Sequence, residues 1–209
     1  MKRHPVLLIG AGGHSRSCID VIEKEGRWDI AGLVGQQAEV GTSVMGYPVI
    51  ARDAELADLA KDYRYALITV GQLRTPGLRV QLFQEAQRHG FALPVVVSPH
   101  AYVSRHARIG DGTVVFHGAV VNAGARIGMN CIVNSRALVE HDVAVGDHCH
   151  ISTGAILNGD VRVGTCSFVG SASVVKQGLT LGEHSFLGMG IALKRDLDAH
   201  SRLTREEST

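Results

Sequence analysis

The chain has 209 residues, of which 21 are Lys or Arg and 20 are Asp or Glu, so its formal net charge is +1. This balance gives no electrostatic reason to expect binding to nucleic acid or to an anionic membrane. The first apolar run, Val6 to Ile9, is too short for a signal-peptide core or a membrane span, and we therefore expect a cytoplasmic protein with no membrane segment.

Strands and helices alternate through the first half of the chain. Val6 to Ile9 is predicted to be a buried strand, followed by a glycine-rich turn at residues 10–15 and an amphipathic helix ending near Gly26. Later strands are expected at residues 30–34, 47–50, 65–70 and 92–97, and helices at residues 52–61 and 78–89. This order predicts an α/β domain with a small parallel, Rossmann-like sheet over residues 1–95.

The second half has a strict period of six. Every sixth residue is aliphatic, at Val97, Val103, Ile109, Val115, Val121, Ile127, Val133, Val139, Val145, Ile151, Leu157, Val163, Val169, Val175, Leu181, Leu187 and Leu193. This period fits neither a helix nor a simple alternating strand, but it fits a chain that turns a corner every six residues and directs one aliphatic side chain inward. We predict a triangular solenoid with eighteen residues per coil over residues 96–195.

Both ends of such a solenoid expose unpaired backbone and need a cap. The N-terminal domain can cover one end. Residues 196–209 break the six-residue repeat, and this C-terminal tail is expected to cover part of the other end or to fray. The four cysteines, Cys18, Cys131, Cys149 and Cys166, lack zinc-ligand spacing and are interpreted as structural thiols.

Two motifs give the chain a family resemblance: a strand leading into Gly10-Ala-Gly-Gly-His14, and the segment Asn134-Ser-Arg-Ala-Leu-Val-Glu-His-Asp142 in the solenoid. Together they resemble PglD/NeuD-type sugar acetyltransferases of the hexapeptide-repeat acyltransferase superfamily, over nearly the whole chain. The resemblance implies a left-handed parallel β-helix, acetyl-CoA as acyl donor, a nucleotide-linked amino sugar as acceptor, and a homotrimer with its sites between subunits.

His141 and Asp142 are the candidate catalytic pair. They occupy the third and fourth positions of the repeat that begins at Val139, so both should point outward at a corner. A neutral imidazole there can accept a proton from an amine or hydroxyl that attacks a thioester, and a neighbouring carboxylate can fix its tautomer. The alternative is a solvated pair on a turn. The resemblance implies that His141 is the general base; Glu140 is a second candidate for orienting it.

Three further residues are assigned around this pair. Gly159 lies one coil beyond His141, where its N–H could stabilise an oxyanion, although turns in this fold favour Gly in any case. His150 lies on another side of the prism, and across a threefold interface it could meet a neighbour's imidazole; the resemblance implies that it contacts acetyl-CoA. Asn134 is a candidate for binding the acceptor or a neighbouring subunit, or it is a turn Asn.

The later corners carry small residues, along which coenzyme A could run. The coenzyme A contacts predicted there are Gly170, Ser171, Gly188 and Met189. Because the tail lacks the C-terminal turn with which relatives close over coenzyme A, no adenine contact is predicted.

The glycine-rich turn is a candidate site for the diphosphate of the nucleotide sugar. Because it follows a strand and precedes a helix, backbone N–H groups can hold phosphate there. The turn departs from the dinucleotide fingerprint, and Val34-Gly-Gln-Gln37 places no acid after the second strand, which argues against NAD. The predicted substrate residues are Gly10, Gly12, Gly13, His14 and Gly71.

The predicted function is N-acetylation of a nucleotide-linked amino sugar, of the 4-amino-4,6-dideoxy type, for surface glycan synthesis, with no metal. Three alternatives stay open at this point. The chain could O-acetylate a sialic or legionaminic acid-type sugar, it could be a non-catalytic binding solenoid, or it could be a metalloenzyme similar to γ-carbonic anhydrases.

Overall fold

The computed structural model describes residues 3–204, in two compact units that divide between Val96 and Val97. The first unit contains a five-stranded sheet in the order β3-β4-β2-β1-β5, parallel except for the β3-β4 pair. Its strands are β1 (His4–Ile9), β2 (Trp28–Gly35), β3 (Ser43–Val44), β4 (Tyr47–Arg52) and β5 (Tyr65–Ile68). This architecture confirms the predicted small parallel sheet.

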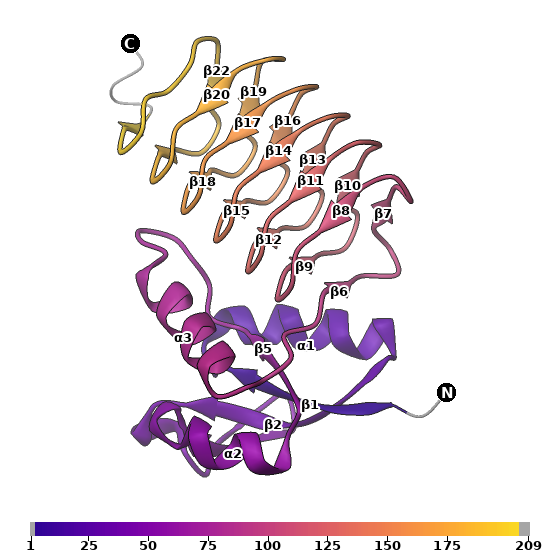
Figure 1. The fold of residues 1–209 in the computed structure, drawn as a ribbon, viewed down its shortest axis with the longest axis vertical. Coiled ribbons are helices and arrows are strands. Elements are labelled where there is room, and N and C mark those ends of the chain that lie inside the picture. The colour runs from indigo at the N-terminus through magenta and orange to yellow at the C-terminus, as the bar shows by residue number, and fades with distance from the viewer. Residues whose placement is uncertain (1–2, 205–209) are drawn as a thin grey trace. The chain divides into compact units, whose positions relative to one another are not determined.

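Three α-helices accompany this sheet: α1 (Gly13–Glu25), α2 (Leu56–Asp62) and α3 (Gly77–Arg88), with 3₁₀ turns at η1 (Gln37–Glu39) and η2 (Asp53–Glu55). Figure 1 shows α1 and α2 on opposite faces of the sheet. The fully buried side chains of β1, residues 6–9, form the centre of the core with Cys18, Ile19 and Val21 of α1. Burial of this apolar surface is the main driving force for folding of the unit.

Two predicted elements of this unit differ from the structure. The helix expected from residue 52 begins only at Leu56, because Arg52 ends β4 and its N–H bonds to the Glu55 carboxylate at 2.9 Å, which stabilises the intervening 3₁₀ turn. Of the strand expected at residues 92–97, only β6 (Val96–Val97) forms, preceded by a single bridge from Ala92 to Tyr65. Pro94 interrupts it, since proline has no N–H to donate to a ladder.

The second unit is a left-handed parallel β-helix built from two-residue strands. After β6 they are β7 (Tyr102–Val103), β8 (Arg108–Ile109), β9 (Val114–Val115), β10 (Val120–Val121), β11 (Arg126–Ile127), β12 (Ile132–Val133), β13 (Leu138–Val139), β14 (Ala144–Val145), β15 (His150–Ile151), β16 (Ile156–Leu157), β17 (Arg162–Val163), β18 (Phe168–Val169), β19 (Val174–Val175), β20 (Thr180–Leu181), β21 (Phe186–Leu187), β22 (Ala192–Leu193) and β23 (Arg202–Leu203). Figure 1 shows the coils stacked along one axis.

The strands form three parallel sheets, one per side of the prism. The β7 sheet contains β7, β10, β13, β16, β19 and β22; the β8 sheet contains β8, β11, β14, β17 and β20; the β6 sheet contains β6, β9, β12, β15, β18, β21 and β23. The second residue of each strand through β22 is the aliphatic residue of the six-residue repeat, and these side chains form the core. The inward direction predicted for the repeat is therefore confirmed.

The β-helix continues past residue 195. Leu197 bridges to Leu181, and β23 pairs in parallel with β21, so Leu203 follows Leu187. Each of these last pairs is sixteen residues apart instead of eighteen, which shifts the repeat by two residues. That shift explains why a six-residue pattern stops at Leu193. Residues 205–209 of the predicted tail lie outside the described residues.

Candidate functional site

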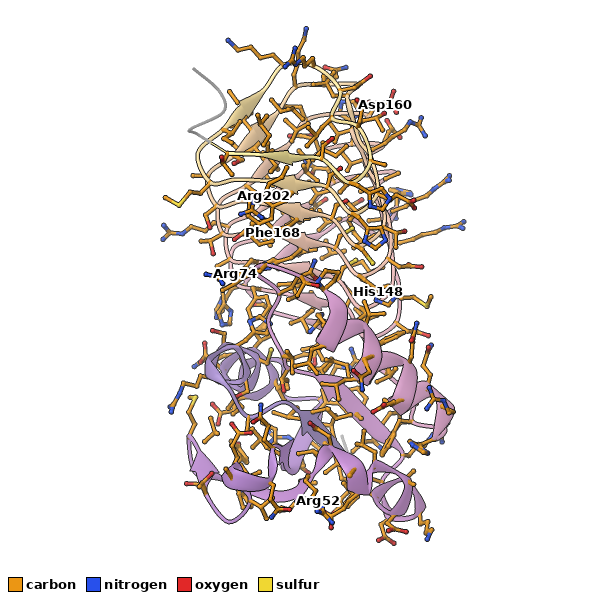
Figure 2. The ribbon with its side chains drawn as sticks, turned by 90° about the vertical axis from the view of Figure 1, so that its left-hand side faces the viewer. Arg52, Arg74, His148, Asp160, Phe168 and Arg202 are labelled. Carbon is orange, nitrogen blue, oxygen red and sulfur yellow. The ribbon has the colours of Figure 1, made fainter. Side chains whose placement is uncertain are left out.

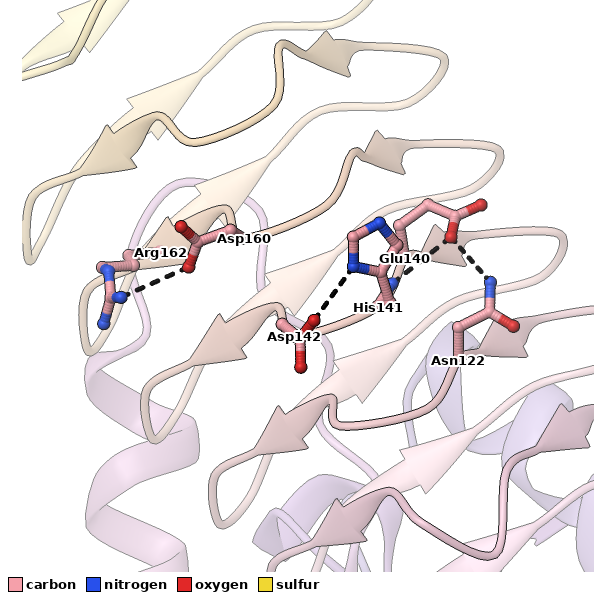
Figure 3. Close-up of polar contacts among 6 residues, drawn as sticks. All are labelled: Asn122, Glu140, His141, Asp142, Asp160 and Arg162. Carbon is pink, nitrogen blue, oxygen red and sulfur yellow. Dashed lines mark hydrogen bonds and ion pairs between the residues drawn. The ribbon is translucent and has the colours of Figure 1, made fainter.

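The corner between β13 and β14 carries the predicted catalytic pair. His141 Nδ1 lies 3.0 Å from Asp142 Oδ2, and the two side chains are 56% and 67% exposed (Figure 3). Because the carboxylate accepts a hydrogen bond from Nδ1–H, the tautomer with a free Nε2 is favoured. Nε2 has no hydrogen-bond partner within residues 3–204, so it is available to take a proton.

Glu140 contacts the main chain rather than the imidazole ring. Its Oε2 accepts hydrogen bonds from Asn122 Nδ2 at 3.0 Å and from the His141 backbone N–H at 3.3 Å (Figure 3). These bonds fix the start of the corner. Asp142, and not Glu140, is therefore the carboxylate placed to orient the ring.

Gly159 lies against the imidazole ring. A Cβ atom at this position would come within 2.6 Å of both Cε1 and Nε2 of His141, which is far closer than atoms approach without displacement. Among the described residues, the Gly159 N–H donates no backbone hydrogen bond. The free ring nitrogen and a backbone N–H without a backbone acceptor thus belong to residues that lie against each other.

Small residues leave room around this pair. Gly124 is one coil before Asp142, and a Cβ there would collide with the Asp142 carboxylate. A hollow of about 220 Å³ opens beside Asp142, with Gly124 and Ala144 as its small residues and Arg126 and Arg162 also in its lining. Arg162 pairs with Asp160 at 3.2 Å (Figure 3).

Asn134 and His150 contact each other on another side of the prism. Asn134 Nδ2 lies 3.1 Å from His150 Nε2, and Asn134 Oδ1 accepts the Ser135 N–H at 2.8 Å. His150 is only 4% exposed and its ring meets Phe168 edge-on, with the ring centroids 5.1 Å apart. His150 is therefore buried within this chain, with Phe168 and Asn134 against its ring.

An aromatic row continues from His150 along the β6 sheet. Phe168 stacks on Phe186 with ring centroids 4.9 Å apart, and the Arg202 guanidinium lies 4.0 Å from the centre of the Phe186 ring. Figure 2 shows Phe168 and Arg202 on the same side of the β-helix.

The predicted coenzyme A residues share one column of corners with Asn134. Gly170 follows β18 and Gly188 follows β21, and a side chain on Gly170 would collide with the Gly188 backbone. Ser171 Oγ bonds to Ser152 Oγ at 2.9 Å, and Met189 is 68% exposed. Within one chain this column is a different corner from that of His141. A single chain therefore does not bring the two predicted groups together.

The N-terminal unit contains a separate cavity of about 190 Å³ at the glycine-rich turn. All five predicted substrate residues line it: Gly10, Gly12, Gly13, His14 and Gly71. Gly10 has φ +119° and is held between Val34 and Thr69, whose hydroxyl donates to the Gly10 carbonyl at 2.7 Å. A Cβ at Gly10 would lie 2.6 Å from a methyl group of Val70, so the turn requires glycine there.

Helix α1 begins directly at this turn. Its N-cap is Gly12, and its first turn contains no acidic residue that would compete with a bound anion. The exposed N–H groups of a helix N-terminus and the positive end of its dipole favour phosphate. The cavity is thus suited to hold a diphosphate.

Sequence reasoning missed two carboxylates in this cavity, Glu39 and Asp53. Glu39 lies in the 3₁₀ turn after β2, and its Oε2 accepts the Gln36 N–H at 2.7 Å. Asp53 directly follows β4. For Asp53, the signal in the sequence was an acidic residue at the end of the extended segment 47–50. The prediction of one helix over residues 52–61 placed Asp53 inside that helix, so the signal was missed.

No group of three or more His, Cys, Asp or Glu side chains within residues 3–204 is arranged to hold a metal ion. No helix in that range is long and apolar enough to cross a membrane.

Comparisons with known proteins identify the family. Residues 5–85 match the model of the PglD N-terminal domain. A variant of perosamine N-acetyltransferase from Caulobacter crescentus, solved with CoA and GDP-perosamine, is 32% identical, with 93% of this chain and 90% of that chain covered and a TM-score of 0.88. The chain belongs to the PglD-type sugar acetyltransferases. No curated protein matched significantly.

A second PglD-type structure gives the same result. The acetyltransferase domain of PglB from Neisseria gonorrhoeae, solved with acetyl coenzyme A, is 32% identical, covers 94% of each chain and has a TM-score of 0.86. WeeI from Acinetobacter baumannii, at 19% identity and a TM-score of 0.84, shows the fold alone. Membership of the PglD-type family confirms the predicted acetyl-CoA-dependent sugar acetyltransferase class over a non-catalytic solenoid.

Proposed function

We propose that the protein transfers an acetyl group from acetyl-CoA to the amino group of a nucleotide-linked sugar of the 4-amino-4,6-dideoxy type, in surface glycan synthesis, with His141 as general base. The observation that carries this proposal is the exposed His141–Asp142 pair with its free Nε2 above Gly159. The similar Caulobacter crescentus enzyme binds CoA and GDP-perosamine, a nucleotide-linked amino sugar, which supports this acceptor class.

In the proposed mechanism, the neutral amine attacks the thioester carbonyl carbon while His141 Nε2 accepts the proton that the nitrogen loses. The C–N bond forms, and the tetrahedral intermediate then collapses with loss of the coenzyme A thiolate, to which the imidazolium returns the proton. Asp142 accepts the Nδ1–H hydrogen bond throughout and stabilises the imidazolium, at the observed 3.0 Å. No covalent enzyme intermediate is required.

The Gly159 N–H is proposed to stabilise the oxyanion of the intermediate. Its open donor lies where the ring of His141 excludes any side chain at residue 159. A preorganised backbone donor of this kind strengthens its interaction as negative charge develops on oxygen. Binding both reactants beside His141 supplies the remaining advantage through proximity.

The active enzyme is proposed to be a homotrimer with sites between subunits. The β7 sheet presents an outward column of apolar side chains: Tyr102, Val120, Leu138, Ile156, Val174 and Ala192. Tyr102 is 59% exposed and Val174 is 36% exposed, and an apolar column of this length on a surface favours contact with another protein. A neighbouring subunit could supply the Asn134 and Met189 corner to the His141 corner.

The proposal is tested by following release of the coenzyme A thiol from acetyl-CoA with GDP-, UDP- and dTDP-linked 4-amino sugars, and with free or CMP-linked nonulosonic acids. We expect release with a nucleotide-linked amino sugar and an acetamido product by mass spectrometry. Release with the nonulosonic acids alone would show that the enzyme O-acetylates these sugars and would contradict N-acetylation. Release with no acceptor of either kind would contradict the whole proposal.

A further inference from the structure

The cavity of the N-terminal unit contains a carboxylate that no other group satisfies. Asp53 lines this cavity, and its Oδ1 atom is buried without a hydrogen-bond partner in the described part of the chain. A buried acceptor without a donor costs free energy, and such atoms are rare in folded proteins. An unsatisfied carboxylate beside a phosphate-binding turn is expected when a ligand supplies the donors.

The other carboxylate of the cavity, that of Glu39, already accepts a hydrogen bond. Glu39 Oε2 accepts the Gln36 N–H at 2.7 Å and lies against Gly35, where a Cβ would come within 2.6 Å of that oxygen. Glu39 therefore fixes the turn after β2. It also leaves Asp53 as the carboxylate of this cavity whose side chain makes no hydrogen bond within residues 3–204.

The sheet order indicates which part of a nucleotide Asp53 would meet. The glycine-rich turn follows β1, the next strand outward is β2, and Asp53 follows β4, one strand farther out. Parallel strands lie about 4.8 Å apart. In a sheet of this type the phosphates lie at the first turn and the ribose lies near the end of the second strand. Asp53 is one strand beyond the ribose position, which places it at the base.

The chemistry of the carboxylate selects among bases. An ionised carboxylate only accepts hydrogen bonds, so it fits an edge with adjacent donors and no acceptor between them. Guanine offers N1–H and the N2 amino group side by side. Uracil places one N–H between two carbonyl oxygens, and adenine places an acceptor nitrogen beside its amino group, so both would set a lone pair against the carboxylate.

We propose that Asp53 recognises the base of the nucleotide-linked sugar and selects guanine, by accepting hydrogen bonds from guanine N1–H and N2–H on its carboxylate. This inference rests on the proposed function, because it names the nucleotide of the same acceptor. Apolar side chains of α3, Leu78 and Leu82, line the cavity and can contact the flat face of a base.

The electrostatics agree with this role. Burial, followed by the charges of Glu39 and Glu85, raises the pKa of Asp53 above its ordinary value. The ionised carboxylate is thus poorly solvated in the free protein. Two neutral N–H donors from guanine would supply the hydrogen bonds that it lacks.

Binding of four nucleoside diphosphates, measured by isothermal titration calorimetry, tests the proposal on the full chain. The probes are GDP, inosine diphosphate, which lacks only the N2 amino group, 2′-deoxyguanosine diphosphate, which lacks only the 2′-hydroxyl, and UDP. Since a hydrogen bond to a charged group is worth about tenfold in affinity or more, we expect GDP to bind at least about tenfold more tightly than inosine diphosphate and UDP. The deoxy probe should bind as GDP does.

The Asp53→Asn variant should bind GDP and inosine diphosphate equally, with UDP binding unchanged. Asp58→Asn is the matched control, since Asp58 lies on α2 and pairs with Lys61. Equal binding of GDP and inosine diphosphate by the wild type would overturn the proposal. It would also be overturned if the wild type bound the deoxy probe more weakly than GDP and Asp53→Asn weakened GDP, inosine diphosphate and UDP equally but not the deoxy probe, which would indicate recognition of the ribose 2′-hydroxyl. Acetyl transfer to a UDP-linked amino sugar in preference to its GDP-linked counterpart would overturn this inference and leave the proposed function standing.

Discussion

At the scale of single residues, the proposed chemistry depends on how His141 is held. The hydrogen bond from Nδ1 to Asp142 fixes the tautomer of the imidazole. The absence of a side chain at Gly159 leaves the space that the ring occupies. Both side chains of the pair are more than half exposed, so their attraction contributes little to stability. Their arrangement therefore matters for reactivity rather than for folding.

Replacing Asp142 by Asn should lower kcat while leaving the fold intact. Asn tolerates the positive φ of 60° at this position, but it removes the charge that stabilises the imidazolium. By analogy with the carboxylates that orient metal-bound histidines, we expect a loss of about ten- to a hundredfold in kcat. Steady-state thiol release measures it. Asp160→Asn, one coil beyond and away from the ring, is the control; an equal loss in both variants would contradict the assignment.

Asp53 should make the free protein less stable at neutral pH than an Asn variant. Because the folded-state pKa of Asp53 is raised, the folded protein favours the protonated form, and stability is lost as the pH rises through that raised pKa. Below the ordinary pKa of an aspartate both side chains are neutral. Melting temperatures of wild type and Asp53→Asn should thus converge at low pH and separate, with the variant higher, toward neutral pH. A difference between the two melting temperatures that does not change with pH would contradict the raised pKa of Asp53 as its cause.

At the scale of elements, the loop after β5 forms one wall of the N-terminal cavity and is held by a buried arginine. Arg79 on α3 is 1% exposed, and its Nη1 donates to the carbonyl oxygens of Ile68 and Val70, both at 2.8 Å. These bonds satisfy the last carbonyl of β5 and one carbonyl of the loop that follows it. They also place Val70 against Gly10.

The Arg79→Met variant should be destabilised, because the buried carbonyl group of Ile68 and the partly buried one of Val70 lose their donor. At about 1–3 kcal/mol for each unsatisfied group, we expect a loss of about 2–6 kcal/mol in the free energy of unfolding. Urea denaturation followed by circular dichroism measures it. Arg88→Met, an exposed substitution at the end of the same helix, is the control. A loss in Arg79→Met no larger than in Arg88→Met would mean that these bonds contribute nothing.

Elements differ in how far the sequence could predict them. The corner position of His141 followed directly from the repeat, because the inward direction of Val139 determines which neighbours point outward. The coil closed by Leu197 and Leu203 could not be read in this way, since its spacing of sixteen residues breaks the period. Asp53 was hidden because local propensity does not mark where β4 ends and a 3₁₀ turn begins.

At the scale of the whole molecule, the three sides of the β-helix carry different chemistry. The β7 sheet is apolar outward, the β8 sheet presents Arg108, Arg126 and Arg162, and the β6 sheet carries the aromatic row from His150 to Arg202. Because the three sides differ, they are not equally suited to contact a neighbouring subunit around a threefold axis. The apolar side is the one expected to be covered.

Ile156→Lys should therefore dissociate the proposed trimer. Ile156 lies in the middle of the apolar column, where a buried charge without a partner is costly. Light scattering after size exclusion should give a trimer for wild type and a monomer without activity for Ile156→Lys. Thr180→Lys, on the β8 sheet, should remain trimeric. A monomeric wild type that is fully active would contradict interfacial sites.

The most direct test of the central claim is the rate of coenzyme A thiol release by His141→Asn, compared with wild type, at saturating acetyl-CoA and nucleotide-linked amino sugar. Asparagine keeps a polar side chain at the corner but cannot accept a proton from the attacking amine. Because a general base contributes about a hundredfold to ten-thousandfold, we expect kcat to fall by at least about a hundredfold with an unchanged melting temperature. A variant that keeps the wild-type kcat would show that proton transfer occurs elsewhere.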